Sequence, residues 1–271
     1  MTNSIVETIS ADGIISKAFS IAQNTNAEYI VALVKSLEHM GTYHSDLAGY
    51  NTNYLVNNNR GWVLLGWHIT FKQYNSPHQD NSINIDTWTH PFRRMQMDRH
   101  FIINDSKKVI ANATSRWIYF DTNRRRPIKP TAEMLDDFII CNKPAPLDEQ
   151  SYKPIDFSDY ALLHKSTVTS VEEDIDINKH TNNVSYIRWA LEAIDQFFKN
   201  TYSNYNNTLS INCNKQLDLK ELHAIYIKET MLGDTVNIKL YKKTEKNSSL
   251  SLIVNFTDSF NNILCQVQLQ L

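Results

Sequence analysis

The sequence predicts an α+β protein in which a long helix is wrapped by a curved antiparallel sheet, and it predicts this unit twice. Each half reads as one strand, one long helix and then four strands. A shift of 153 residues places the predicted helix at 182–200 on 29–47 and residues 233–238 on 80–85. Because residue identity between the halves is low, the predicted repeat depends on the order and spacing of the elements.

The composition indicates a globular protein. The 271 residues suffice for one large domain or two small ones, and a formal charge of -2 argues against a chain built mainly to hold nucleic acid. Cys141, Cys213 and Cys265 lie far apart in an odd total, which predicts neither a disulfide framework nor a zinc site. With no leader-like N-terminus and no apolar segment long enough for a bilayer, we expect a cytoplasmic protein.

In the first half, a loosely alternating strand at 12–22 precedes a helix whose apolar stripe recurs at steps of three and four. Asn26 is a candidate cap for this helix, and its end is blurred between Gly41 and Gly49. The stripe consists of Ile30, Leu33, Leu37 and Met40, and the strands that follow are expected at 61–74, 83–88, 95–103 and 109–120.

Between the halves, residues 121–156 hold five of the seven prolines, which predicts an extended linker with a short helix at 132–140. The second half is then expected to contain a strand at 164–171, the helix at 182–200, and strands at 221–228, 235–244, 249–257 and 263–271. We therefore predict an N-terminal domain at 1–122, a linker at 123–156 and a C-terminal domain at 157–271.

The second helix is preceded by a polar triplet. Asp176, Asn178 and His180 alternate, so that an extended backbone would project all three side chains from one face, and Thr181 or Asn182 can cap the helix. The first-turn amides of a helix stabilise an oxyanion, so a reactive site could lie here. Asp, Asn and His are, however, also ordinary residues of loops and helix caps. At the matching positions the first half has Gln23, Thr25 and Ala27, and this difference favours a function for the triplet. The helical stripe itself consists of Val184, Ile187, Leu191, Ile194 and Phe198.

Motifs in both halves resemble those of the acyl-acyl carrier protein (acyl-ACP) thioesterases, which are double hotdog proteins. The second half carries the pattern D-x-N-x-H-x-N-N-x-x-Y, in Asp176, Asn178, His180, Asn182, Asn183 and Tyr186, followed by Trp189 and Glu192. The first half is similar at Asp86, Thr87, Trp88, Arg99, Phe101, Asp105, residues 113–117 and residues 123–127. The resemblance covers nearly the whole chain and implies a tandem hotdog fold.

The resemblance also implies an activity, the hydrolysis of fatty acyl-ACP without cofactor or metal. It assigns the catalytic roles to Asp176, Asn178, His180 and, in the strand after the second helix, Glu229. The next residue is Thr230 where plant members often have Cys, which excludes a thiol nucleophile. The turn at 80–81 reads Asp-Asn where the family more often has Gly-Asp, and the absence of a transit peptide makes the chain look like a bacterial-type member.

A mechanism follows as a hypothesis. Of the two carboxylates, Glu229 and Asp176, one activates water and the other stabilises the site or attacks the acyl carbon. Asn178 holds one of these carboxylates in place by a hydrogen bond. His180 shuttles a proton, and early amides of the second helix polarise the carbonyl oxygen. Because a solvated Glu is a weak base at neutral pH, we expect a dry site with both carboxylates.

Basic residues in the linker predict a partner. Arg124, Arg125, Arg126 and Lys129, with Arg93, Arg94 or Arg116 as further candidates, would steer an acidic acyl carrier protein and grip its phosphopantetheine; a solvated charge run is the alternative. Scattered histidines (His68, His78, His90, His100 and His223) are expected at the surface or satisfied within strands.

Other functions remain open at this point, namely an acyl-CoA thioesterase, a hotdog dehydratase and a non-catalytic acyl-carrier binding module. Two fused halves already supply what single hotdogs obtain by dimerising, but a homodimer would not be surprising.

Overall fold

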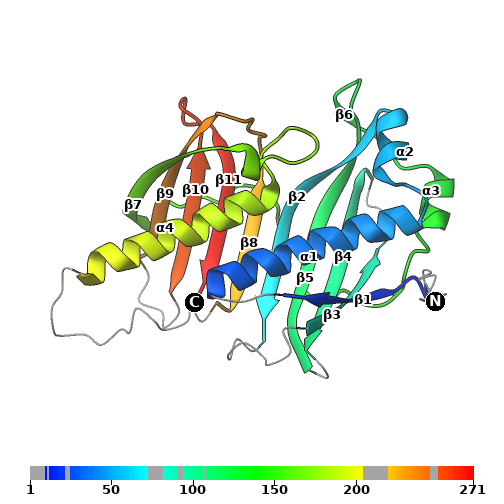
Figure 1. The fold of residues 1–271 in the computed structure, drawn as a ribbon, viewed down its shortest axis with the longest axis horizontal. Coiled ribbons are helices and arrows are strands. Elements are labelled where there is room, and N and C mark those ends of the chain that lie inside the picture. The colour runs from blue at the N-terminus through cyan, green and yellow to red at the C-terminus, as the bar shows by residue number, and fades with distance from the viewer. Residues whose placement is uncertain are drawn as a thin grey trace, which may run out of the picture. The chain divides into compact units, whose positions relative to one another are not determined.

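The computed structural model describes residues 10, 12–21, 25–72, 82–90, 94–105, 108–203, 219–244 and 250–271. The chain divides into two compact units. The first comprises residues 1–21, 34–65 and 77–149, and the second comprises residues 22–33, 66–76 and 150–271. Figure 1 shows their elements. The domain boundaries expected at 1–122, 123–156 and 157–271 stay a prediction.

Five strands of the first half follow one another in the order β1-β3-β4-β5-β2, and the pairs β1–β3, β3–β4 and β4–β5 are antiparallel. All five strands confirm predicted ones. Their bounds are β1 (Ile15–Ser20), β2 (Arg60–Phe71), β3 (Ser82–Thr89), β4 (Gln96–Asp105) and β5 (Lys108–Asp121). The predicted turn at 80–81 lies outside the described residues.

The second half repeats this order as β7-β9-β10-β11-β8, strand for strand. From Gly66 onward β2 belongs to the second unit, where it pairs antiparallel with β8. The shared strand order confirms the predicted internal repeat. The bounds are β7 (Tyr160–Thr169), β8 (Glu221–Tyr226), β9 (Thr235–Lys243), β10 (Ser251–Thr257) and β11 (Ile263–Gln270).

The first long helix, α1 (Asn26–Leu47), continues through Gly41. Its start is capped by Thr25, whose Oγ1 accepts from the Glu28 amide at 3.2 Å while the Glu28 carboxylate accepts from the Thr25 amide at 3.1 Å. The expectation that Asn26 is the cap was therefore wrong, because Asn26 is already helical. The predicted stripe is confirmed, since Ile30, Leu33, Leu37 and Met40 are all fully buried.

The second long helix, α4 (Asn183–Ser203), crosses the strands β7 to β11 of its own unit (Figure 1). Asn182 caps it, because its Oδ1 accepts from the Val184 amide at 2.8 Å. Tyr186 and Trp189 pack on Phe256 of β10 at ring distances of 5.3 and 6.4 Å. A buried helical face against an antiparallel sheet confirms the predicted packing of this half.

Residues 150–157 cover the other face of that sheet. Since side chains alternate along a strand, Tyr226, which contacts Tyr186 of α4, and His223 point to opposite faces of β8. The ring of Tyr152 lies 5.4 Å from that of His223. The buried Gln266 holds Ile155 at both backbone groups, accepting from its amide at 2.9 Å and donating to its carbonyl at 3.4 Å. The end of the predicted linker is thus packed on the sheet.

Short elements complete the chain. The helix α3 (Ala132–Asp137) confirms the predicted short helix, whereas α2 (Thr52–Asn57), the two-residue strand β6 (Arg126–Pro127) and the 3-10 helix η1 (Glu172–Asp174) were not predicted. In the first unit Tyr50, Met134 and Phe138 form a small buried cluster with Tyr119. Within the described part of the chain, none of the helices combines the length and the apolar character needed to cross a membrane.

Candidate active site

The structure brings His180 and Glu229 together, with His180 Nε2 3.4 Å from Glu229 Oε2. His180 lies in the loop before α4, and Glu229 lies three residues after the end of β8, which is shorter than the predicted strand at 221–228. An antiparallel bridge pairs His180 with Met231. Glu229, two residues before Met231, is therefore the diagonal neighbour of His180 on the same face.

The polar triplet forms a turn, so the expectation of an extended backbone was wrong. The Oδ1 of Asp176 accepts from the amides of Asn178 and His180 at 2.8 and 3.2 Å, and its Oδ2 accepts from Asn178 Nδ2 at 3.2 Å. Lys179 completes the turn with a φ of 67°. Short polar side chains favour such bonds to nearby backbone, and Asp176 thereby organises the loop that presents His180.

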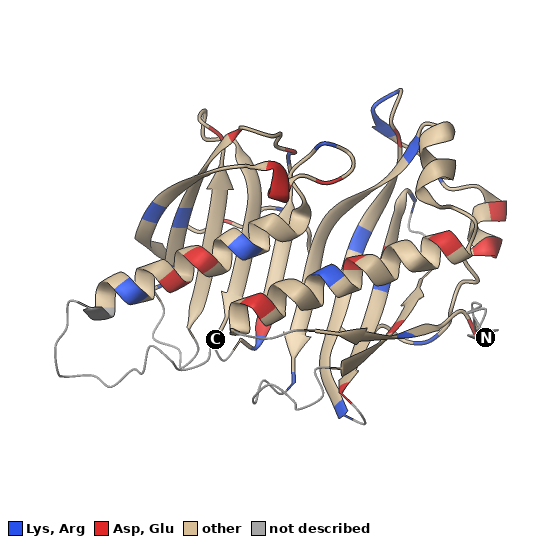
Figure 2. Cartoon of the chain, viewed as in Figure 1, with Lys and Arg blue, Asp and Glu red and all other residues tan. Residues whose placement is uncertain are grey.

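The reactive pair is open to solvent, contrary to the expectation of a dry site. The side chains of His180 and Glu229 are 32% and 57% exposed, and Asn178 is exposed as well. Exclusion of water from this pair would therefore depend on a bound substrate. Acidic residues predominate on the surrounding loops, and Figure 2 shows the acidic η1 in red just before α4. This end of the second unit offers an acidic partner little attraction.

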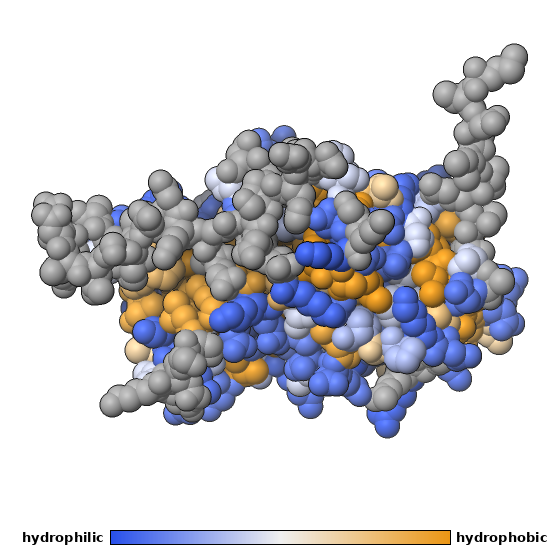
Figure 3. Space-filling view, turned by 90° about the horizontal axis from the view of Figure 1, so that it is seen from below, coloured by the Kyte–Doolittle hydropathy of each residue, from blue (hydrophilic) through white to orange (hydrophobic). Residues whose placement is uncertain are grey.

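Apolar side chains are exposed on the loops around the pair. Ile177 is 78% exposed, Met231 49% and Leu232 53%. Figure 3 shows that hydrophobic patches among hydrophilic residues also occur elsewhere on the surface, so a single exposed apolar residue carries no special meaning. Three of them on the loops that hold His180 and Glu229 provide contacts suited to an apolar ligand.

Two of the amides expected to polarise a carbonyl are already occupied. The Val184 amide donates to Asn182 Oδ1 at 2.8 Å, and the Ser185 amide donates to the Asn182 carbonyl at 2.9 Å. An oxyanion site built on these two donors is therefore excluded in this conformation.

An ion pair that the sequence did not indicate anchors the start of α4. Asp174 is 2% exposed, and its Oδ1 accepts from Arg188, one of the helix residues. Its Oδ2 accepts from the Val171 amide at 3.1 Å, and its carbonyl accepts from the Asn182 amide at 2.6 Å. Asp174 and Arg188 are 14 residues apart, and no sequence pattern would have paired them.

The predicted basic residues lie in the first unit. Arg124 and Arg125 lie in the turn between β5 and β6, Arg126 in β6 and Lys129 just beyond, and all four are exposed. Figure 2 shows this hairpin in blue. Arg116, a further candidate for the group, donates to both carboxylate oxygens of Asp98 at 2.7 Å. Arg93 lies outside the described residues.

Several histidines lie within the sheets, as predicted. His68 contacts Glu221 at 2.7 Å, and His100 contacts His90 and Thr114 at 3.1 and 3.0 Å. Burial, followed by the charge of His90, lowers the pKa of His100 to about 4. His78 is not among the described residues. Where the chain is described, no group of three or more His, Cys, Asp or Glu side chains is arranged to hold a metal ion.

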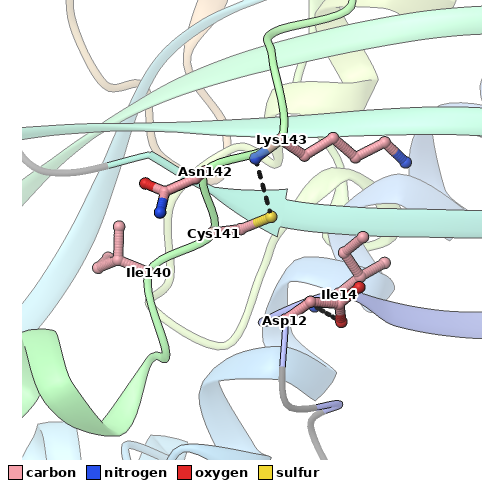
Figure 4. Close-up of a pocket in the computed structure, with 6 residues that line it drawn as sticks. All are labelled: Asp12, Ile14, Ile140, Cys141, Asn142 and Lys143. Atoms are coloured by element: carbon pink, nitrogen blue, oxygen red, sulfur yellow. Dashed lines mark hydrogen bonds between the residues drawn. The ribbon is translucent and has the colours of Figure 1, made fainter.

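A pocket of about 430 Å³ lies in the first unit. Figure 4 shows its lining, which includes Asp12, Ile14, Cys141 and Lys143, with the Lys143 amide donating to the Cys141 sulfur. None of the predicted catalytic residues lines this pocket. We therefore assign it no chemistry.

Solved structures share this architecture over nearly the whole chain. An acyl-ACP thioesterase from Bacteroides thetaiotaomicron superposes with a TM-score of 0.70 at 22% identity, covering 95% of this chain and 97% of that one. A 12:0-ACP thioesterase from Umbellularia californica gives 0.72 at 15% identity, with coverages of 95% and 96%. These likenesses confirm the predicted α+β tandem hotdog fold.

Sequence comparisons point to the same group of proteins as the solved structures. Residues 18–138 match the acyl-ACP thioesterase N-terminal domain, and residues 171–269 match the thioesterase-like superfamily. An oleoyl-acyl carrier protein thioesterase of Arabidopsis thaliana is 31% identical over 52% of this chain and 40% of its own length. One from Coriandrum sativum is 27% identical over 66% and 52%. The chain thus spans about half the length of these curated relatives, and it is similar to acyl-ACP thioesterases in its first half and to the wider thioesterase-like superfamily in its second.

Proposed function

We propose that this protein hydrolyses the thioester of fatty acyl-ACP and releases a free fatty acid. The observation that carries the proposal is the contact of 3.4 Å between His180 and Glu229, two groups capable of acid–base chemistry. The loop built by Asp176 and Asn178 presents His180 to Glu229 in the half that matches the thioesterase-like superfamily. The names of the relatives, which include acyl-carrier protein thioesterases and hydrolases, support the same substrate class.

In the proposed mechanism Glu229 is the general base and Asp176 is a positioning residue. Both oxygens of Asp176 already accept hydrogen bonds within the loop, whereas Glu229 faces solvent beside His180. Glu229 takes a proton from water, and the resulting hydroxide attacks the thioester carbon. The carbon–sulfur bond then breaks, and the proton reaches the leaving sulfur through His180, so that acid and thiol are formed from thioester and water.

The direct test replaces Glu229 by Gln and His180 by Ala. Removing a general acid or base typically costs 10²–10⁴-fold in rate, so both variants should lose at least about 100-fold in turnover while remaining folded. Purified protein would be assayed with acyl-ACPs of varied chain length by the release of free thiol, with circular dichroism as the check on folding.

Glu172→Gln and His39→Ala are matched controls, because both residues are exposed and neither contacts the pair. Near-full activity of either test variant would remove the proposed roles. A wild-type protein that binds acyl-ACP without releasing thiol would instead identify a binding module.

An acidic acyl carrier protein is the proposed partner, and the exposed group of Arg124, Arg125, Arg126 and Lys129 is the proposed contact. Complementary charges raise association rates most at low salt. Reversing Arg124 and Arg126 to Glu should therefore raise KM for acyl-ACP and flatten its salt dependence, with acyl-CoA turnover unchanged. Faster turnover of acyl-CoA than of acyl-ACP by the wild type would favour the alternative, an acyl-CoA thioesterase.

We also propose a reducing compartment such as the cytoplasm, which the free and buried Cys141 and Cys265 support. The homodimer stays a prediction, and light scattering of the purified protein would test it.

A further inference from the structure

We propose that three buried hydroxyls, those of Thr181, Tyr186 and Thr230, hold His180 and Glu229 in register for the reaction. We call these three residues the hydroxyl chain and infer that they are positioning residues. The inference rests on the proposed function, because it explains how the site of that reaction is kept in place.

The hydroxyl chain joins three segments of the second unit. Thr230 Oγ1 donates to Thr181 Oγ1 at 2.8 Å, and the Tyr186 hydroxyl lies 2.9 Å from Thr230 Oγ1. The three residues are only 3–6% exposed. Burial raises the pKa of the Tyr186 phenol, so that it stays a neutral hydroxyl and can donate at any physiological pH. Removing the hydroxyl of any one of the three residues would therefore take a hydrogen-bond partner from another buried hydroxyl, which costs free energy.

The chain acts on the adjacent residues through strand geometry. The Thr181 amide donates to the Thr230 carbonyl at 2.8 Å, next to the antiparallel bridge between His180 and Met231. Thr181 and Thr230 are therefore directly opposite each other, and neighbouring residues point to the other face. The two threonines face inward and His180 and Glu229 face outward. A slip of one residue would turn one of the reactive side chains inward.

The reactive pair does not hold this register by itself. The pairing around His180 consists of isolated bridges and not of a regular ladder. The contact between His180 and Glu229 is long, at 3.4 Å, and both side chains are partly exposed. Exposed ion pairs contribute little to stability, so this pair does not fix its own geometry. Hydrogen bonds between buried groups, which water does not compete for, are the stronger constraint.

The test compares Thr230→Val with Thr230→Ser. Valine keeps the shape of threonine and removes the hydroxyl, and a displacement of about 1 Å can cost up to 10²-fold in rate. We expect Thr230→Val to lower kcat for acyl-ACP by about 10-fold or more with KM nearly unchanged. Thr230→Ser, which keeps the hydroxyl, should restore kcat to within about 3-fold of wild type. Tyr186→Phe should give a smaller loss than Thr230→Val, because the bond between the threonines remains.

Thr257→Val is the matched control for burial. Thr257 is 3% exposed, and its hydroxyl has no hydrogen-bond partner among the described residues. The same substitution there removes no bond and should leave kcat unchanged. A loss of activity in Thr257→Val equal to that in Thr230→Val would show that any buried threonine is equally sensitive, and would overturn the inference.

A double-variant cycle separates positioning from general destabilisation. If Thr230 acts through the reactive pair, adding Thr230→Val to Glu229→Gln should lower the residual rate by less than about 2-fold. A full 10-fold further loss, or a single Thr230→Val variant with wild-type kcat, would refute the inference. Neither result would touch the proposed function, which fails only if the wild type releases no thiol or if Glu229 and His180 prove dispensable.

Discussion

Replacing His223 by Phe should make the stability of this protein less sensitive to acid. His223 lies on β8, 9% exposed, beneath the ring of Tyr152 and beside His68 and Glu221. Its Nε2 has no hydrogen-bond partner among the described residues. Burial lowers its pKa from 6.5 to about 4, the charge of His68 adds to this effect and the charge of Glu221 opposes it. A buried imidazole that stays neutral in the folded state makes stability depend on pH.

The sign and the size follow from proton linkage. Between pH 6.5 and about 4 the unfolded chain binds a proton at His223 that the folded chain does not bind, so stability falls as the pH falls through this window. One pKa unit corresponds to about 1.4 kcal/mol, which gives roughly 3 kcal/mol in full and about 2 kcal/mol by pH 5. His100, whose pKa is also lowered to about 4, contributes with the same sign in wild type and variant alike.

Urea unfolding at several pH values between 7.5 and 5 measures this effect. The loss of unfolding free energy between pH 7.5 and pH 5 should be smaller by about 2 kcal/mol in His223→Phe than in wild type. Glu221 also has a lowered pKa, caused chiefly by its hydrogen bond with His68, but its contribution is lost only in more acidic solution. Measurements above pH 5 therefore isolate the imidazole.

His39→Phe is the control, since His39 is an exposed histidine on α1 in edge-on contact with Phe19. Its removal should leave the pH dependence of unfolding unchanged. If His223→Phe and wild type lose stability in parallel, the neutral buried state of His223 is refuted, and with it the account of residues 150–157 as a cover that excludes water from this face.

Two further substitutions test that cover. Gln266→Leu should lower the free energy of unfolding in urea by about 1–3 kcal/mol, because it leaves both backbone groups of Ile155 without their partner. The same substitution should speed proteolytic cleavage between residues 150 and 157, and an unchanged cleavage rate would contradict the role of Gln266. Gly66→Ala should destabilise the protein by roughly 1–3 kcal/mol or more, because the added Cβ would lie 2.2 Å from the Ala224 carbonyl oxygen and 2.5 Å from the Tyr152 ring. Adding Tyr152→Ala would relieve only the contact with the ring. Full recovery of stability in the double variant would therefore show that the backbone clash is unimportant.

Local pattern accounts for the elements that were predicted correctly. The stripes of α1 and α4 recur at the helical period because one face of each helix is buried, and this period can be read without any tertiary contact. The spacing of the two halves likewise indicated the repeat that the strand order confirms. The short elements α2 and η1 were missed because six and three residues carry too little periodicity.

The candidate site shows the limit of the same reasoning. Its motif residues could be named from their resemblance to a family, but the geometry of Asp176, Asn178 and His180 could not. Alternation suggested a strand, whereas the Asp176 carboxylate folds back on two amides and makes a turn. Whether a side chain bonds to its own loop or points at a substrate depends on competition between local and distant partners, which the pattern does not record.

By itself the sequence determined the two long helices, the ten long strands, their repetition and the resemblance to a family, because all of these follow from periodicity and motif spacing along the chain. Tertiary structure alone decided which groups meet. Thr181 and Thr230 are 49 residues apart, Asp174 and Arg188 are 14 apart, and Gln266 reaches Ile155 across 111 residues. Such contacts depend on strand order and on which face each side chain takes, and both are fixed only when the whole sheet assembles.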